Sequence, residues 1–96
     1  MTLTATWSQL TSWDIQYVPE KEGVYELADN SQSIIYIGRS NNLRRRLSEH
    51  LNSDDHCLRN ARYFRYEQTW RSEERERELL NEYRRIHGRL PRCNDI

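Results

Sequence analysis

The 96-residue sequence predicts a single domain of the α+β class. Three segments are strand-like, because β-branched and apolar residues lie between turn-forming residues: 23–28, 33–38 and 62–69. Two other segments, 42–51 and 72–87, repeat apolar residues at helical spacing. A chain of this length buries one modest core, and a hydrophobic content of 35% against 31% charged residues predicts a polar surface around it.

Residues 1–17 are predicted to be an N-terminal arm, and residues 18–96 the domain itself. The arm is polar apart from two spaced tryptophans, Trp7 and Trp13, which we expect to pack on the domain. Pro19 then opens an extended lead-in to the first strand.

The first two strands are predicted to form a β-hairpin around the turn-forming residues 29–32. A four-residue loop pairs residue 28 with residue 33, and this register places Tyr25 directly opposite Tyr36. Cross-strand neighbours on one face have Cβ atoms about 4.5–5.5 Å apart. The two tyrosines are therefore expected at one spot, unless a β-bulge changes the register.

Helix 42–51 is predicted to begin at a run of capping residues and to carry one apolar stripe. The stripe includes His50, and Arg46 lies at its edge one turn earlier. These two side chains can therefore share a site. Arg44 and Arg45 are predicted to face outward.

The third strand, 62–69, is followed by a long helix, 72–87, with Ser72 as its predicted cap and Gly88 as its stop. Glu82 is predicted to border the buried face of this helix and to point inward. The predicted buried stripe consists of Leu79, Tyr83 and Ile86.

The formal net charge is zero, but the charges are unevenly distributed. Residues 1–38 have a balance of −4, residues 39–71 have a balance of +4, and residues 72–96 cancel. All but one of the fifteen basic residues are arginine, whose rigid fork of donors suits phosphate. Biased composition explains the lysine shortage equally well, so the basic middle third is the better argument for an anion-binding face.

Cys57 and Cys93 lack metal-type spacing, and we predict that both are free thiols in a reducing compartment. No apolar run approaches the length of a membrane span, and the N-terminus lacks the pattern of a signal peptide. The expectation is a cytoplasmic protein that does not associate with membranes.

An ordered set of motifs resembles the GIY-YIG nuclease family. The set is Gly23-Val24-Tyr25, Tyr36-Ile37-Gly38, Arg46, Glu82 and Asn94. Each motif is weak alone, but the spacing of the whole set is specific, and its closing part is similar to the nuclease end of the excision-repair incision subunit. The resemblance implies the GIY-YIG fold, a three-stranded antiparallel sheet flanked by helices. It also implies cleavage of DNA phosphodiester bonds with Mg²⁺ or Mn²⁺.

The resemblance also implies a role for each residue of a catalytic set: Tyr25, Tyr36, Arg46, His50 and Glu82. Glu82 is the implied Mg²⁺ ligand, with Glu78 as its rival, because one hard oxygen ligand suits an ion that keeps most of its waters. Arg46 would clamp the scissile phosphate. One tyrosine would accept a proton from water, and the sequence does not say which. His50 would orient a tyrosine or relay a proton, although simple packing explains it equally well.

A second set is implied to contact DNA: Gly38, Arg39, Arg44, Arg45 and Asn94. Asn94 fits a supporting role in site geometry better than a catalytic one. Two functions stay open on this basis. The first is an endonuclease that recognises DNA structure or has low sequence specificity, is monomeric when free and has a protein partner as one source of specificity. The alternative is a nucleic-acid-binding module with weak or no catalysis.

Overall fold

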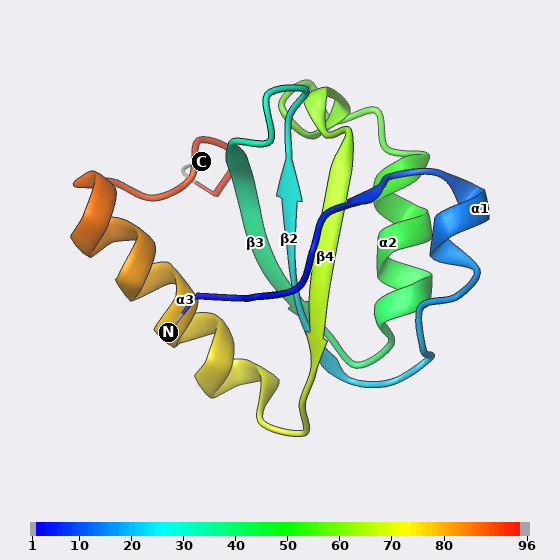
Figure 1. The fold of residues 1–96 in the computed structure, drawn as a ribbon, viewed down its shortest axis with the longest axis horizontal. Coiled ribbons are helices and arrows are strands. Elements are labelled where there is room, and N and C mark those ends of the chain that lie inside the picture. Colours follow the sequence, from blue (N-terminus) through cyan, green and yellow to red (C-terminus); the bar gives the residue numbers. More distant parts are fainter. Residues whose placement is uncertain (1, 95–96) are drawn as a thin grey trace.

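In the computed structural model, which describes residues 2–94, an antiparallel sheet carries helices on both faces (Figure 1). The elements are β1 (Ser8–Gln9), α1 (Ser12–Ile15), β2 (Gly23–Ala28), β3 (Ile34–Ser40), α2 (Leu43–Leu51), the 3₁₀ helix η1 (Leu58–Asn60), β4 (Tyr63–Gln68) and α3 (Ser72–His87). The strand order is β1-β4-β2-β3. The predicted α+β class is confirmed, and the short β1 adds a fourth strand to the predicted three. Of the helices within the described residues, none combines the length and apolarity needed to cross a bilayer.

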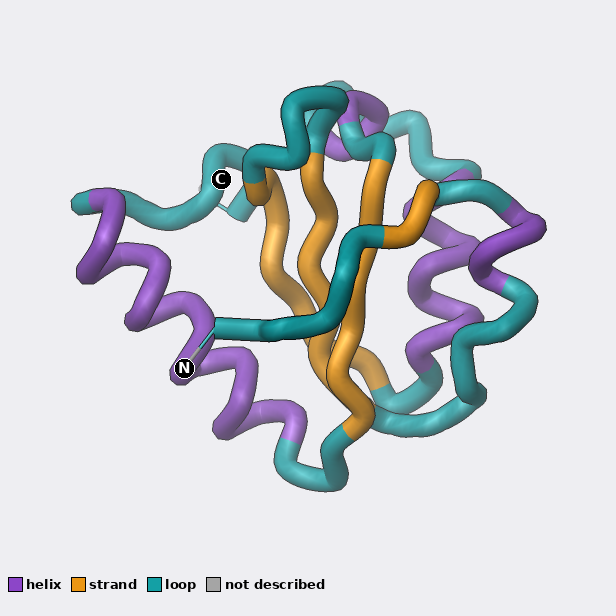
Figure 2. The backbone as a smooth tube through the Cα atoms, in the orientation of Figure 1, coloured by secondary structure: helices purple, strands orange, loops and turns teal. Residues whose placement is uncertain are grey.

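The sheet separates two hydrophobic cores, and Figure 2 shows α1 and α2 on one side of the strands and α3 on the other. The larger core, on the α2 face, includes Tyr25, Leu27, Leu43, Leu47 and Phe64. The smaller core, on the α3 face, consists of Leu3, Val24, Ile37 and Leu79. The alternation of side chains along β2 therefore sends Tyr25 toward α2 and its neighbour Val24 toward α3.

The hairpin loop is one residue longer than the sequence predicts. The backbone N–H of Asp29 donates to the carbonyl of Ser33 at 3.0 Å. The Asp29 carboxylate accepts hydrogen bonds from the N–H groups of Ser31 and Ser33, at 2.9 and 3.1 Å. Because this side chain closes the turn inside the loop, Ala28 pairs with Ile34. The predicted pairing of residue 28 with residue 33 is wrong.

A β-bulge then shifts the register again. Leu27 pairs with Tyr36, which leaves Ile35 as the extra residue of β3. Tyr25 consequently lies opposite Gly38, and the predicted direct pairing of the two tyrosines is wrong. The total shift is two residues, so both tyrosines still point to the α2 face, as predicted, in a diagonal arrangement.

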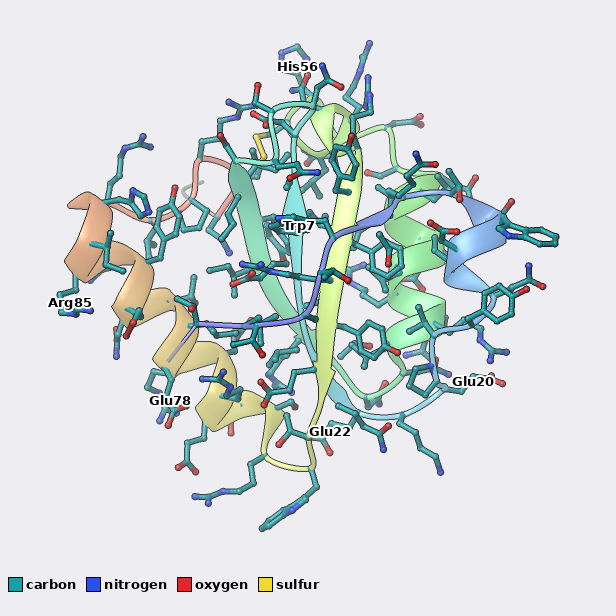
Figure 3. All side chains as sticks on the ribbon, in the orientation of Figure 1. Trp7, Glu20, Glu22, His56, Glu78 and Arg85 are labelled. Atoms are coloured by element: carbon teal, nitrogen blue, oxygen red, sulfur yellow. A yellow bond between two sulfur atoms is a disulfide. The ribbon has the colours of Figure 1, made fainter. Side chains whose placement is uncertain are left out.

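Both long helices begin close to their predicted positions. Asn42 caps α2, because its side-chain oxygen accepts a hydrogen bond from the N–H of Arg45 at 3.0 Å. The N-cap of α3 is Arg71 rather than the predicted Ser72. The carboxylate of Glu22 replaces a capping side chain there, since it accepts hydrogen bonds from both the backbone N–H and the hydroxyl of Ser72 (Figure 3). A carboxylate at a helix N-terminus is favoured by the helix dipole.

The end of α3 leaves the sheet, as Figure 1 shows. Gly88 terminates the helix with a positive φ of 76°, as predicted for a glycine stop. Leu79 is buried, but Ile86 is 55% exposed, so its predicted place in the buried stripe is wrong. The apolar stripe extends along α3 beyond the part of the helix that packs on the sheet.

The N-terminal arm packs only in part. Leu3 is buried, and the ring of Trp7 packs against Arg65 of β4, whose Cζ lies 4.1 Å from the ring centroid (Figure 3). Trp13 is 69% exposed, which contradicts the prediction that both tryptophans pack on the domain. The single turn of α1 uses Ile15 to contact the core, and this leaves Trp13 turned outward. The boundary at residue 17 remains a prediction.

Cys57 and Cys93 form a disulfide bond, so the prediction of two free thiols is wrong. Their Cα atoms lie 5.7 Å apart, although 36 positions separate the residues in sequence. Spacing along the chain carried no information about this distance, which depends on the fold. The bond ties the segment before η1 to the C-terminal tail, and the N–H of Cys93 donates to the carbonyl of Ile35 on β3 at 2.9 Å.

Removing the disulfide is expected to lower the free energy of unfolding by about 2–4 kcal/mol, because the bond restricts the unfolded chain. The Cys57→Ser/Cys93→Ser double variant leaves no unpaired thiol, and urea unfolding measures the loss. As a control, a reductant should lower the unfolding midpoint of the native sequence but not that of the variant. Equal midpoints for the oxidised and reduced native sequence would contradict the prediction.

Candidate active site

Four of the five predicted catalytic residues come together on the α2 face of the sheet. The hydroxyl of Tyr25 lies 2.7 Å from Nε2 of His50. The ring of Tyr36 has its centroid 6.1 Å from that of Tyr25 and 5.4 Å from that of His50. The guanidinium of Arg46 interacts electrostatically with Tyr25. We call this group the phenol cluster: Tyr25, Tyr36, Arg46 and His50.

Gly38 allows the two phenols to approach each other. A Cβ atom at this position would lie 2.7 Å from the hydroxyl oxygen of Tyr25 and 2.8 Å from Cε2 of Tyr36. These distances are too short for any side chain, so glycine is required here by packing. Its predicted role in DNA binding stays a prediction, while its observed contacts are with the phenol cluster.

The hydrogen-bond donors and acceptors of the phenol cluster can be assigned. Arginine carries donors only, so the positive charge of Arg46 favours the oxygen of Tyr25 rather than its hydroxyl hydrogen. Burial, helped by the charge of Arg46, lowers the pKa of His50 to about 4, so the imidazole is neutral near pH 7 and can accept a proton. Tyr25 therefore donates its hydroxyl hydrogen to Nε2, and this order requires the Nδ1–H form of His50.

The two tyrosines differ in exposure. Tyr25 is only 1% exposed, whereas Tyr36 is half-buried on the edge strand β3. Burial raises the pKa of Tyr25 above its ordinary value, and the charge of an ionised Tyr36 raises it further, although Arg46 opposes both effects. Tyr25 is thus held protonated inside the protein, and Tyr36 is the phenol that solvent reaches.

The three consecutive arginines of α2 have different surroundings. Arg46 contacts Tyr25 on its inner side and donates to Glu49 at 2.9 Å, and 41% of its side chain is exposed. Arg44 donates to the carbonyl of Val18 at 2.8 Å and so anchors the segment before β2. Arg45 donates to the side chain of Asn41 at 2.9 Å. Of these three arginines, only Arg46 interacts with the two tyrosines while its side chain is also partly exposed to solvent.

Glu82 lies on a different layer from the phenol cluster. It is half-buried on α3, where it is 3.5 Å from Arg85. Arg75 lies on the same stripe of the helix and donates to Glu67 of β4 at 3.1 Å. Figure 3 shows Arg85 and Glu78 along α3 on the side away from the strands. Arg75 is therefore directed toward β4, and Glu82 lies two turns further along the same stripe, next to Tyr83, which packs on the smaller core.

A neighbouring stripe of α3 is directed toward β3 instead. The guanidinium of Arg39 lies 4.0 Å from the carboxylate of Glu76 and 3.9 Å from that of Glu73. Arg39 directly follows Gly38, so these carboxylates approach the strand segment that supports the phenol cluster. Glu76 is the more buried of the two, with 29% of its side chain exposed. Burial raises its pKa, Arg39 partly offsets this effect, and Glu73 adds to it.

Sequence reasoning missed Glu76. It lies three residues before the buried Leu79, just as Glu82 lies three residues after it, so both border the apolar stripe. This symmetric spacing was the available signal. The spacing alone could not show that the side of α3 that carries Glu76 approaches Arg39 of β3.

Asn94 binds the outer edge of β3 through both ends of its side-chain amide. Its oxygen accepts from the N–H of Ile37 at 2.9 Å, and its nitrogen donates to the carbonyl of the same residue at 2.8 Å. The amide thus replaces a neighbouring strand at this point of the sheet edge. This contact agrees with a supporting role in geometry, and a direct contact with DNA stays a prediction.

The donor groups fit a magnesium ion held mainly by water and substrate. Mg²⁺ prefers oxygen ligands and typically takes only one or two carboxylates from the protein. Within residues 2–94, no group of three or more His, Cys, Asp or Glu side chains forms a metal cage. A partly desolvated carboxylate such as that of Glu76 is nevertheless stabilised by a nearby cation.

The fold and this cluster define a GIY-YIG nuclease domain, and comparisons with known proteins support that class. The magnesium-bound GIY-YIG N-terminal endonuclease domain of UvrC from Thermotoga maritima superimposes with a TM-score of 0.62 and 26% identity, covering 75% of this chain and 88% of that domain. A point mutant of the same domain, at 22% identity and a TM-score of 0.58, shows the shared fold.

Curated relatives are UvrABC system protein C from Rickettsia felis, 39% identical over 54 residues, and from Rickettsia bellii, 33% identical over 54 residues. The aligned segment covers 56% of this chain but 8% of either relative. The chain belongs to the family described as Domain of unknown function (DUF7508), whose model matches residues 1–86.

His50 is expected to remain neutral down to about pH 4 in the folded protein. Its pKa in the unfolded chain is near the ordinary 6.5, so the unfolded chain binds the proton more readily between these values. The contribution of neutral His50 to the free energy of unfolding is therefore complete above about pH 6.5. It is lost progressively as the pH falls from there toward 4. NMR titration of the ring measures the pKa, and a His50→Asn variant should lose this part of the pH dependence of unfolding. A ring midpoint near 6.5 in the folded protein would contradict the prediction.

Proposed function

We propose that this domain is a divalent-metal-dependent endonuclease that hydrolyses DNA phosphodiester bonds. The observation that carries the proposal is the phenol cluster, in which Arg46 and His50 converge on Tyr25 beside Gly38. The likeness to the UvrC endonuclease domain supports it independently. Structure-selective recognition of DNA, a monomeric free state and a protein partner that supplies specificity remain predictions.

Within this proposal, Tyr36 is the phenol that meets the attacking water, because Tyr25 is almost fully buried. Tyr25 is a positioning residue: its hydrogen bond to His50 and its contact with Arg46 fix the guanidinium beside Tyr36. The raised pKa of Tyr25 keeps this buried phenol protonated.

Arg46 and Arg39 provide the phosphate contacts in this proposal. Arg46 lies on the α2 side of β3, and Arg39 lies on the α3 side next to Glu76. Charge-assisted hydrogen bonds from guanidinium groups to phosphate oxygens are strong and stabilise the growing negative charge of the reaction. The bound cation would neutralise further charge at the phosphate and at the leaving oxygen. We assign Glu76, which lies 4.0 Å from Arg39, to hold it, and Glu82, which the motif spacing predicts, is the alternative ligand.

A binding module without useful catalysis is the second candidate. The observation that favours it is that several basic residues form internal contacts. Arg44 pairs with Glu20 and Arg75 with Glu67, which leaves fewer free charges for phosphate than the sequence suggested. Cleavage assays separate the two candidates.

Replacing Arg46 with alanine is expected to lower the rate of DNA cleavage by about 10²–10³-fold, the usual effect of removing one charge-stabilising donor. Supercoiled, single-stranded and branched DNA are incubated with the protein and Mg²⁺ or Mn²⁺, and strand breaks are counted on gels. Arg77→Ala, an exposed arginine of α3, is the matched control and should cleave at the normal rate. Equal rates for the Arg46→Ala variant and the native sequence would remove Arg46 from the mechanism.

The choice of metal ligand is tested by two isosteric substitutions. Glu76→Gln is expected to abolish Mg²⁺-dependent cleavage, because it removes the charge beside Arg39, whereas Glu82→Gln should retain most activity. DNA binding without added metal should survive both changes. The reverse pattern would establish Glu82 as the ligand, as the motif spacing predicts. If the native sequence binds DNA but breaks no strand with either metal ion, the domain is a binding module.

A further inference from the structure

Trp70 is the most exposed large aromatic residue among the described side chains, with 82% of its surface accessible. It lies in the loop between β4 and α3, outside both hydrophobic cores. An indole offers a large, rigid aromatic face on which another ring can stack. The neighbouring Arg71 has its guanidinium 5.6 Å from the ring centroid, which leaves most of the ring open.

Two adjacent hollows share Trp70 as a wall. One, of about 320 Å³, is also lined by Lys21, Gln68 and Thr69. The other, of about 310 Å³, continues to Arg39. Arg39 lies on the α3 face of β3, so the second hollow connects the indole with one of the proposed phosphate contacts, across the sheet from the phenol cluster.

The lining of these hollows suits a nucleotide. Lys21 is the only lysine of the chain, and Gln68 and Thr69 present side-chain donors and acceptors. The two hollows are also lined by three carboxylates, Glu22, Glu73 and Glu74, so their charge is balanced. Glu22 is occupied with the N-terminus of α3 (Figure 3), and Glu74 with Arg71. Binding here must therefore depend on stacking against the indole more than on net charge.

We propose that Trp70 is a stacking platform for an unpaired base of single-stranded or branched DNA, placed in hollows that reach Arg39, one of the proposed phosphate contacts. An aromatic ring binds the face of any base, and this face is free only when the base is not stacked within a duplex. The proposal deepens the proposed nuclease function by naming its substrate class: DNA with unpaired nucleotides next to the cleaved bond. It rests on that function for its biological meaning, but the binding itself does not require cleavage.

Fluorescence anisotropy in EDTA tests the platform without cleavage, with labelled oligo-dT, a forked duplex and a blunt duplex as probes. Trp70→Ala is expected to weaken binding of oligo-dT and of the fork by about 10-fold, in the range measured for the loss of one base stack. Binding of the blunt duplex should change less than about twofold. Trp70→Phe should restore most of the affinity. Trp13→Ala, which removes another exposed tryptophan on α1, is the matched control and should behave like the native sequence.

The stacking contribution should also be nearly independent of salt, because no counterion is released when the indole stacks. Unchanged binding of oligo-dT and of the fork by Trp70→Ala would overturn the proposal. An equal loss of affinity for all three probes would also overturn it, since that result indicates a general effect. These outcomes are separate from the nuclease test: a native protein that cuts DNA while Trp70→Ala binds normally refutes only the platform. Selective loss of unpaired-DNA binding in a protein that never cuts supports the platform and refutes the nuclease.

Discussion

The buried hydrogen bond between Tyr25 and His50 is the interaction on which the candidate site depends. It joins the central strand β2 to α2 inside the larger core, where both polar groups need a partner. Burial favours the uncharged form of each ring, and this makes the hydroxyl a donor to the imidazole. Arg46 then has a fixed oxygen to contact, so its charge is held beside the phenols.

The edge strand β3 is the second element that shapes the site. Its inner side pairs with β2, and its outer edge binds the C-terminal tail through Asn94 and Cys93. Unpaired strand edges are liable to pair with other chains, so this cover has a structural use as well. The disulfide to Cys57 holds the tail in place. Tyr36 lies between these two constraints, fixed by pairing on one side and by the tail on the other.

The two faces of β3 carry different chemistry. The α2 face presents the phenols and Arg46, and the α3 face presents Arg39 with the carboxylates of Glu73 and Glu76. A phosphate at this edge would meet guanidinium groups from both faces. Each guanidinium also has carboxylate neighbours, Glu49 beside Arg46 and Glu73 with Glu76 beside Arg39, so both signs of charge meet at this edge of a domain whose formal net charge is zero.

By itself, the sequence determined the α+β class, three of the strands, the two long helices and the face shared by Tyr25 and Tyr36, because these follow from local periodicity and from the parity of a hairpin. The spacing of Arg46 and His50 on one helix likewise needed no tertiary information. Only the tertiary structure decided the bulged register, the Cys57–Cys93 bond and the side of α3 that is directed toward β3. These depend on distances between segments far apart in the chain, and no pattern of neighbouring residues records such distances.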